Sequence, residues 1–295
     1  MNCPNCGLDV PDQSLECRGC GIIFAKIKAR PPLAGLPGSK ALPAAPADAL
    51  SLGRAGWTSL LAGLFLAALV FLVPALNFIF QALLILVHEL GHAAAGWAFG
   101  YASIPAFDFA YGGGVTLHQE RSMLLVALVY ALMAGAAWAL RRNGLAVHVI
   151  AVAAVLYTVL AITPAHQFLT VLMGHGSELA ISAVFLSRSM GGWALAYPIE
   201  RPLYGFAGFF ILLADLKFSY RLWSSEASRW EYRQAKGGGD WMDFSKISRD
   251  FLHTDLETVA MLFFLLCLLT PVAAFLAFRY RKRVVGFTNA LLSRD

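Results

Sequence analysis

Long apolar blocks dominate the sequence from residue 57 onward. No Asp, Glu, Lys or Arg interrupts residues 258–278, and each of two further blocks, 57–100 and 145–187, contains a single such residue. Because a membrane-spanning helix needs about 20 mainly apolar residues, the pattern predicts an all-α polytopic membrane protein with about 6–7 transmembrane helices. The expected spans lie at about 57–75, 78–99, 122–140, 145–163, 168–187, 202–218 and 258–278.

The two ends of the chain constrain the number of crossings. A basic run at 279–283 favours a cytoplasmic C-terminus, and the polar, cysteine-bearing head at 1–30 favours a cytoplasmic N-terminus. Two ends on one side of the membrane require an even number of crossings. We therefore expect one of the seven segments to be re-entrant or to lie in the membrane interface.

The composition excludes an ordinary soluble domain. Hydrophobic residues make up 58% of the 295 residues and charged residues only 14%, against about 25% charged residues in an average soluble domain. The net charge of +5 fits Lys and Arg side chains in loops beside anionic lipid. Since no basic stripe marks a soluble face, no nucleic-acid partner is expected.

Three less apolar segments divide the chain. Residues 31–55 contain five prolines and predict a Pro/Ala-rich linker before a multi-pass membrane domain at 56–295. Residues 219–257 carry six basic and seven acidic side chains with three tryptophans. This mixture predicts an amphipathic interfacial segment, which three consecutive glycines at 237–239 interrupt. Residues 101–121 are too aromatic and Gly-rich for an ordinary polar loop.

Four of the five cysteines lie in the first 20 residues, as two CxxC pairs: Cys3 with Cys6, and Cys17 with Cys20. Each pair lets a tight turn bring two thiolates to one ion. The segment resembles a zinc ribbon, and the resemblance implies a structural zinc with all four positions filled. Two redox-active pairs are the alternative. A closed zinc site implies a docking or regulatory module.

His88, Glu89 and His92 form an HExxH motif inside the second apolar block. Positions i and i+4 of a helix share one face, so both imidazoles can bind one zinc ion. Glu89 can then reach a water on that ion and act as general base. Ionisable residues inside a span are costly and by default mark a functional site. The alternative is a packing role for two interior histidines with satisfied hydrogen bonds.

The motif, with Phe99-Gly100 after it and a Gly-rich apolar hairpin candidate through Gly114-Val115, resembles the site-2 protease class of intramembrane zinc metalloproteases, peptidase family M50. The resemblance covers the stretch 88–115. It implies a membrane-embedded β-hairpin that receives an unwound substrate, and hydrolysis of peptide bonds in or near the membrane. It also implies His88 and His92 as zinc ligands and Glu89 as the catalytic base.

The family takes its third zinc ligand from an Asp in an LDG motif on a later span, and the sequence contains no such motif. A catalytic zinc needs three protein ligands. His175 and Glu178 lie at i and i+3, on one face of a predicted helix. We expect Glu178 as the third ligand, and His175 as the next candidate or as a partner that orients a ligand. Asp215 is the runner-up, although Lys217 lies beside it.

These features predict an intramembrane zinc metalloendopeptidase with one catalytic Zn²⁺ in the membrane domain and one structural Zn²⁺ in the ribbon. Its substrate would be a membrane protein or peptide in or near the lipid bilayer, and the ribbon could bind a protein partner. One alternative is a non-hydrolytic zinc-binding membrane protein for metal transport or sensing. Another is an inactive scaffold with a partner-binding ribbon. We expect the bacterial inner (plasma) membrane, with the ribbon in the cytoplasm.

Overall fold

The structure, a computed structural model, describes residues 9–11, 14–16, 19 and 52–293. It divides the chain into two compact units, Met1–Gly53 and Arg54–Asp295. The four cysteines of the predicted zinc ribbon lie outside the described residues, as does most of the predicted linker; these cysteines are Cys3, Cys6, Cys17 and Cys20. The second unit contains the HExxH motif.

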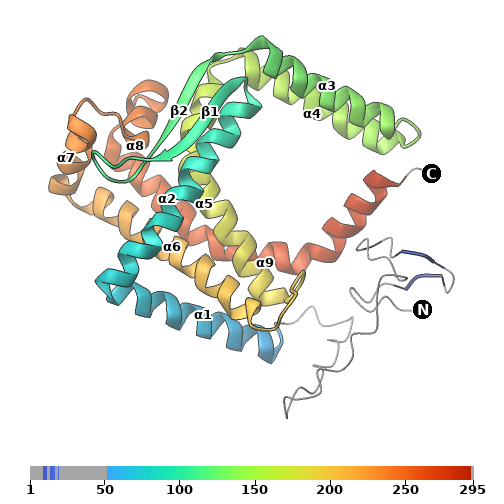
Figure 1. Cartoon of the computed structure of the whole chain (residues 1–295), viewed down its shortest axis with the longest axis horizontal. Helices are drawn as coiled ribbons and strands as arrows, with labels where there is room; N and C mark the ends of the chain where they lie inside the picture. The colour runs from blue at the N-terminus through green and yellow to red at the C-terminus, as the bar shows by residue number, and fades with distance from the viewer. Residues whose placement is uncertain (1–8, 12–13, 17–18, 20–51, 294–295) are drawn as a thin grey trace. The chain divides into compact units, whose positions relative to one another are not determined.

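Long helices form most of the second unit (Figure 1). They are α1 (Arg54–Leu72), α2 (Pro74–Ala98), α3 (Met123–Ala139), α4 (Gly144–Ile162), α5 (Ala165–Gly191), α6 (Glu200–Ser224) and α9 (Leu256–Leu292). Within the described residues, six of them are long and apolar enough to cross a membrane, whereas α3 has only 17 residues. All seven predicted segments are thus helical, and six candidate spans make an even number.

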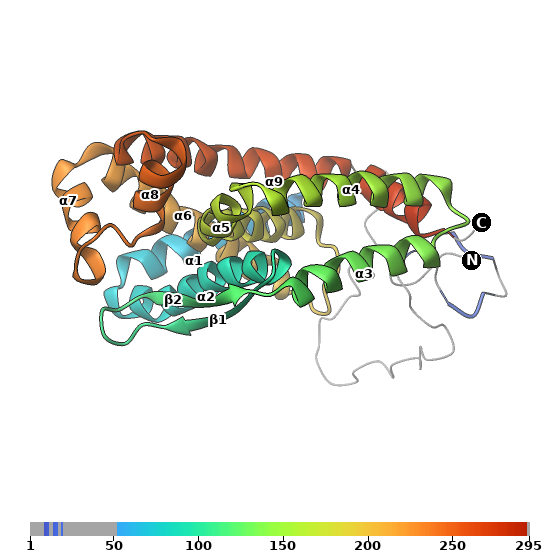
Figure 2. The ribbon, with the colours of Figure 1, turned by 90° about the horizontal axis from the view of Figure 1, so that it is seen from above.

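Short elements connect the long helices. After α2, the strands β1 (Tyr101–Phe107) and β2 (Gly114–Arg121) pair antiparallel as the hairpin that the sequence predicts in this segment. The connection between α6 and α9 contains α7 (Glu226–Gln234), a 3₁₀ turn η2 (Ala235–Gly237), α8 (Asp243–Lys246) and a π-helical turn η3 (Ile247–Leu252). In the view from above, the hairpin lies along α2, and α3 lies beside α4 (Figure 2).

Small residues let the helices of the second unit approach closely, as in other membrane helix pairs. A Cβ atom on Gly63 of α1 would lie 2.5 Å from the backbone of Gly205 in α6. A Cβ on Gly91 of α2 would overlap the carbonyl oxygen of Met173 in α5. The second contact matters for the site, because it brings the HExxH motif against α5.

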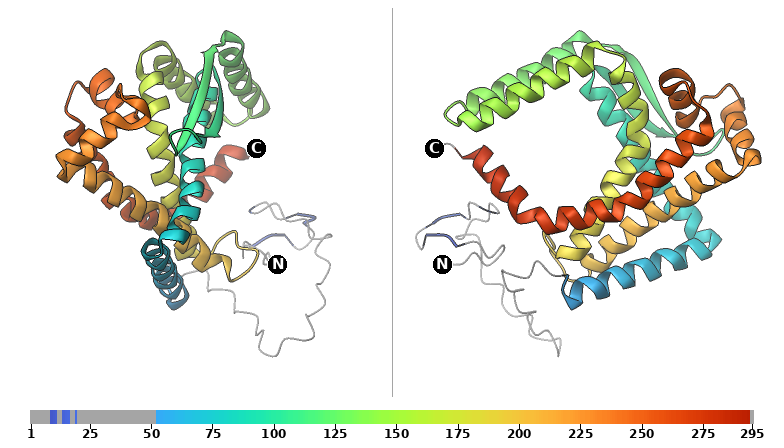
Figure 3. Two further views of the ribbon diagram at one scale, coloured as in Figure 1. Left: turned by 60° about the vertical axis from the view of Figure 1, so that its left-hand side comes forward. Right: turned by 180° about the vertical axis from the view of Figure 1, so that it is seen from behind.

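The outer faces of the helices remain apolar. Leu72 and Phe78 are 80% and 81% exposed, respectively, and a helix that is apolar on all sides is typical of a protein core or a membrane. The longest helix, α9, bends along its length (Figure 3) and contains Pro271 in its interior. Proline removes a backbone hydrogen bond and bends a helix.

Candidate metal centre

The HExxH motif lies on α2, where it faces α5. The Nε2 atoms of His88 and His92 are 3.1 Å apart, and the two ring centroids are 4.7 Å apart. Both imidazoles therefore converge on one point, as their spacing of four residues predicts for a helix.

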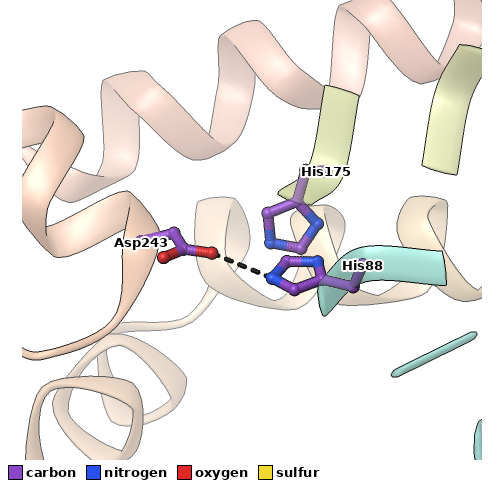
Figure 4. Close-up of side chains that lie close together, drawn as sticks. All are labelled: His88, His175 and Asp243. Atoms are coloured by element: carbon purple, nitrogen blue, oxygen red, sulfur yellow. Dashed lines mark hydrogen bonds and ion pairs between the residues drawn. The ribbon is translucent and has the colours of Figure 1, made fainter. Parts of the chain in front are cut away.

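A carboxylate from a distant segment completes this group. Oδ2 of Asp243 lies 2.9 Å from Nε2 of His88 and 2.9 Å from Nε2 of His92. In Figure 4, Asp243 extends from α8 toward the His88 ring. The three glycines at 237–239, before α8, have φ angles of +84°, +86° and +90°. Glycine adopts such angles without steric cost, so the chain can turn back toward α2 here.

The neighbouring Phe244 fixes the start of α8. Its ring centroid is 4.7 Å from that of His175 and 5.1 Å from that of Phe263, and its side chain is only 1% exposed. Its backbone N–H donates to the hydroxyl of Tyr232 at 3.1 Å. A buried aromatic side chain and a buried hydrogen bond thus hold Asp243 in place.

The partners of the two Nδ1 atoms indicate which nitrogen of each histidine carries the proton. Nδ1 of His92 lies 2.7 Å from the carbonyl oxygen of Thr170. A carbonyl only accepts, so Nδ1 donates there, and in a neutral imidazole Nε2 is then an acceptor. Glu178 Oε2, 3.4 Å from Nδ1 of His88, favours the same tautomer for His88. Both Nε2 lone pairs therefore face the Asp243 carboxylate, so three acceptors meet without a proton between them. A cation bound by all three would remove this repulsion.

The donor set fits zinc in chemistry and spacing. The three donor atoms are 2.9–3.1 Å apart, and ligands of a tetrahedral zinc at about 2.0 Å from the metal are roughly 3.3 Å apart. Two imidazoles and a carboxylate leave one position open, as in catalytic zinc sites.

Gly174 of α5 leaves space for the two rings. A Cβ atom at this position would lie 2.6 Å from Nε2 of His88 and closer still to Nε2 of His92. Since any side chain would occupy the place where the two Nε2 atoms meet, only glycine fits here without moving an imidazole.

Glu89 points to the hairpin and is only 6% exposed. The Thr116 hydroxyl, on β2, donates to Glu89 Oε2 at 2.6 Å. A Cβ on Gly114 would lie 2.5 Å from Oε1 of Glu89, so this strand also approaches closely. The hairpin therefore positions the carboxylate of the motif, and Oε1 has no hydrogen bond to any of the described residues.

A cavity of about 760 Å³ contains these groups. Its walls come from α2, the hairpin, α5 and the segment from η2 to α8. Its polar lining includes His88, Glu89, His92, Thr116, His118, Glu178, Lys236 and Asp243. A volume of this size is typical of a pocket that binds a small ligand.

The two residues predicted as further ligands, His175 and Glu178, both lie next to His88. The rings of His175 and His88 have centroids 4.5 Å apart, and one donor atom each of His88, His175 and Asp243 lies within 4.8 Å of the others (Figure 4). Oε2 of Glu178 contacts Nδ1 of His88 rather than Nε2. Their roles as ligands stay predictions. Asp215 lies beyond them, 3.8 Å from Nδ1 of His175.

Sequence patterns do not single out Asp243. It is one of seven acidic residues in the polar segment 219–257. The available signal is the glycine run at 237–239, which allows a sharp turn. That signal does not distinguish Asp243 from Asp240, which follows the glycines directly.

Comparisons of this chain with known protein families, with curated proteins and with solved structures find no match.

Proposed function

We propose that the protein is an intramembrane zinc metalloprotease, with His88, His92 and Asp243 as the zinc ligands. The observation that carries the proposal is the convergence of three acceptor atoms, two Nε2 and one Oδ2, within 3.1 Å of one another. Asp243 takes the place for which the sequence suggests Glu178. Glu178 and His175 then orient the His88 imidazole, as carboxylates commonly do next to a zinc-bound histidine.

When bound there, zinc supplies Lewis-acid polarisation of a carbonyl and lowers the pKa of water. Glu89 acts as the general base. Its Oε2 atom is held by the Thr116 hydroxyl, so Oε1 takes the proton of the attacking water. Oε1 then passes this proton to the departing amine, and the peptide bond is cleaved.

The hairpin supports a peptide as the substrate. Among the described residues, β2 has one strand neighbour, β1, and residues 114–116 and 118 of β2 line the cavity. An extended peptide can add to a free strand edge through main-chain hydrogen bonds. Such a segment would reach the cavity beside Glu89, which contacts the same strand.

Six candidate spans support a membrane location. We place the protein in the bacterial inner membrane, with the two ends of the second unit in the cytoplasm, because the basic run at 279–283 favours that side. We further propose that Cys3, Cys6, Cys17 and Cys20 bind a structural zinc in the cytoplasm, and that this ribbon binds a protein partner.

The test measures hydrolysis of fluorescein-labelled casein by the full-length chain, purified in detergent and loaded with Zn²⁺. We expect Glu89→Gln to keep its zinc and to lower turnover about 10²–10⁴-fold. Glu120→Gln is the matched control, because Glu120 lies exposed on the same hairpin, and it should keep wild-type turnover. Zinc binding without any casein hydrolysis above the Glu89→Gln level would contradict the proposal and favour a non-hydrolytic zinc-binding protein.

A further inference from the structure

A second group of ionisable side chains lies behind the metal centre, on α5 and α6. Nδ1 of His175 is 2.7 Å from Oε2 of Glu178 and 3.8 Å from Oδ1 of Asp215. One donor atom of each of the three residues lies within 4.8 Å of the other two. We call His175, Glu178 and Asp215 the second cluster.

The second cluster carries two carboxylates in an apolar environment. Glu178 and Asp215 are each 2% exposed, and both belong to helices long and apolar enough to cross a membrane. Within the described part of the chain, Oδ2 of Asp215 is buried without a hydrogen-bond partner. An unpaired buried polar atom costs free energy, and two buried carboxylates repel each other. The imidazoles of His88 and His175 both contact Glu178, whereas Asp215 faces His175 alone of these two.

We propose that the second cluster binds a divalent cation of the Zn²⁺ or Mn²⁺ class. A set of one imidazole and two carboxylates suits such ions. The cation would offset both negative charges, and the Asp215 carboxylate, whose Oδ2 has no hydrogen-bond partner among the described residues, would be one of its ligands. This site is additional to the hydrolytic centre of the proposed function.

A separate cavity of about 480 Å³ gives access to the second cluster, since all three of its residues line the cavity wall. Two basic residues, Lys217 and Arg221, also line it. Their charges are directed to other partners: Lys217 lies 5.5 Å from the centroid of the Phe71 ring, and Arg221 is 4.0 Å from Oε2 of Glu231. The charged groups of both residues therefore contact groups other than the two carboxylates of the second cluster.

Asp215 is the residue that distinguishes the two sites. Glu178 contacts His88 of the first centre as well as His175, so its substitution would affect both. Asp215 instead lies on the far side of His175, with Oδ1 3.8 Å from its Nδ1. Asp215→Asn keeps the shape of the side chain and removes its charge, so its effect reports on the second cluster.

The experiment counts zinc ions per chain by mass spectrometry. The full-length protein is purified in detergent, loaded with Zn²⁺ and separated from free metal by gel filtration. The variants are Asp215→Asn, Asp243→Asn and their combination. Glu226→Gln is the matched control, because it removes an exposed charge from α7 outside the second cluster. We expect each single variant to lose one ion, the combination to lose two, and the control to lose none.

Two results would overturn the second site: wild-type zinc content in Asp215→Asn, or a combined variant that loses no more than one ion. The latter would mean that both carboxylates serve a single ion. Asp215→Ser provides a second variant if Asp215→Asn does not fold, and it should lose the same ion. Loss of an ion from Asp215→Asn but not from Asp243→Asn would support the second site and contradict the ligand set of the proposed function.

Discussion

Oδ2 of Asp243 lies 2.9 Å from Nε2 of His92, although 151 positions separate the two residues along the chain. His92 belongs to a long apolar helix, and Asp243 begins a helix of four residues in a polar connection. The two segments are far apart in the sequence, so they meet only when the helices between them have packed together. Their contact also supplies the carboxylate of the proposed zinc site.

Replacement of Asp243 and of Glu178 by their amides should have different effects on zinc. We expect Asp243→Asn to lose one zinc ion per chain, because an amide oxygen is a weak zinc ligand. Glu178→Gln should keep that ion with an affinity lower by about 10–100-fold, the usual effect of a residue that orients a ligand. It should also lose the separate ion proposed for the second cluster, of which Glu178 is a member. Competition with a chromophoric chelator measures both. Asp250→Asn changes an exposed residue of the same segment and should behave as wild type. If Glu178→Gln lost the ion at the HExxH motif and Asp243→Asn only bound it more weakly, Glu178 would be the ligand instead.

Alanine substitutions at two glycines of α5, Gly174 and Gly176, test whether the imidazoles need the space that Gly174 leaves. A Cβ at Gly174 would press on both His88 and His92, whereas one at Gly176 would make an ordinary 3.5 Å contact with the sulfur of Met173. We expect Gly174→Ala to lower the free energy of unfolding by about 1–3 kcal/mol and to weaken zinc binding. Gly176→Ala should raise stability by about 0.5–1 kcal/mol, because alanine favours a helix. Thermal unfolding in detergent and zinc titration check both; equal effects would mean that Gly174 does not shape the site.

Thr116 should affect turnover without affecting the metal. Its hydroxyl donates to Oε2 of Glu89 at 2.6 Å, and a hydrogen bond to a charged group contributes about 1.5–3 kcal/mol. Thr116→Val should therefore lower kcat for casein about 10–100-fold with unchanged zinc content. Thr116→Ser retains the hydroxyl and should restore most of the activity. An unchanged kcat in Thr116→Val would show that the hairpin does not position the base.

The sequence predicts the helices and the histidine pair because both depend on local rules. Apolar blocks of about 20 residues form helices in lipid since every backbone group must be paired within the segment. The spacing of His88 and His92 then places both rings on one side. The hairpin at 101–121 is also local, because a glycine with φ +97° at Gly100 ends α2 and starts a strand.

Local rules do not predict that Asp243 is the carboxylate next to the His88 and His92 rings. By composition, any of the seven acidic residues in 219–257 could be the third ligand. The burial of Phe244 between His175 and Phe263 selects Asp243, and that packing involves three separate helices. Glu178 is recognisable from the sequence as a lone charge in its span. Its contact with Nδ1 of His88 rather than with Nε2 depends on how α5 crosses α2.

The separation of the ligands also sets the order of events during synthesis. His88 and His92 leave the ribosome early, but Asp243 follows only after α5 and α6. A nascent chain that has inserted its first spans thus holds two of the three groups and cannot assemble the centre. If the proposed function holds, the centre therefore becomes complete only after most of the second unit has been made, so an unfinished chain would not cleave neighbours in the same membrane.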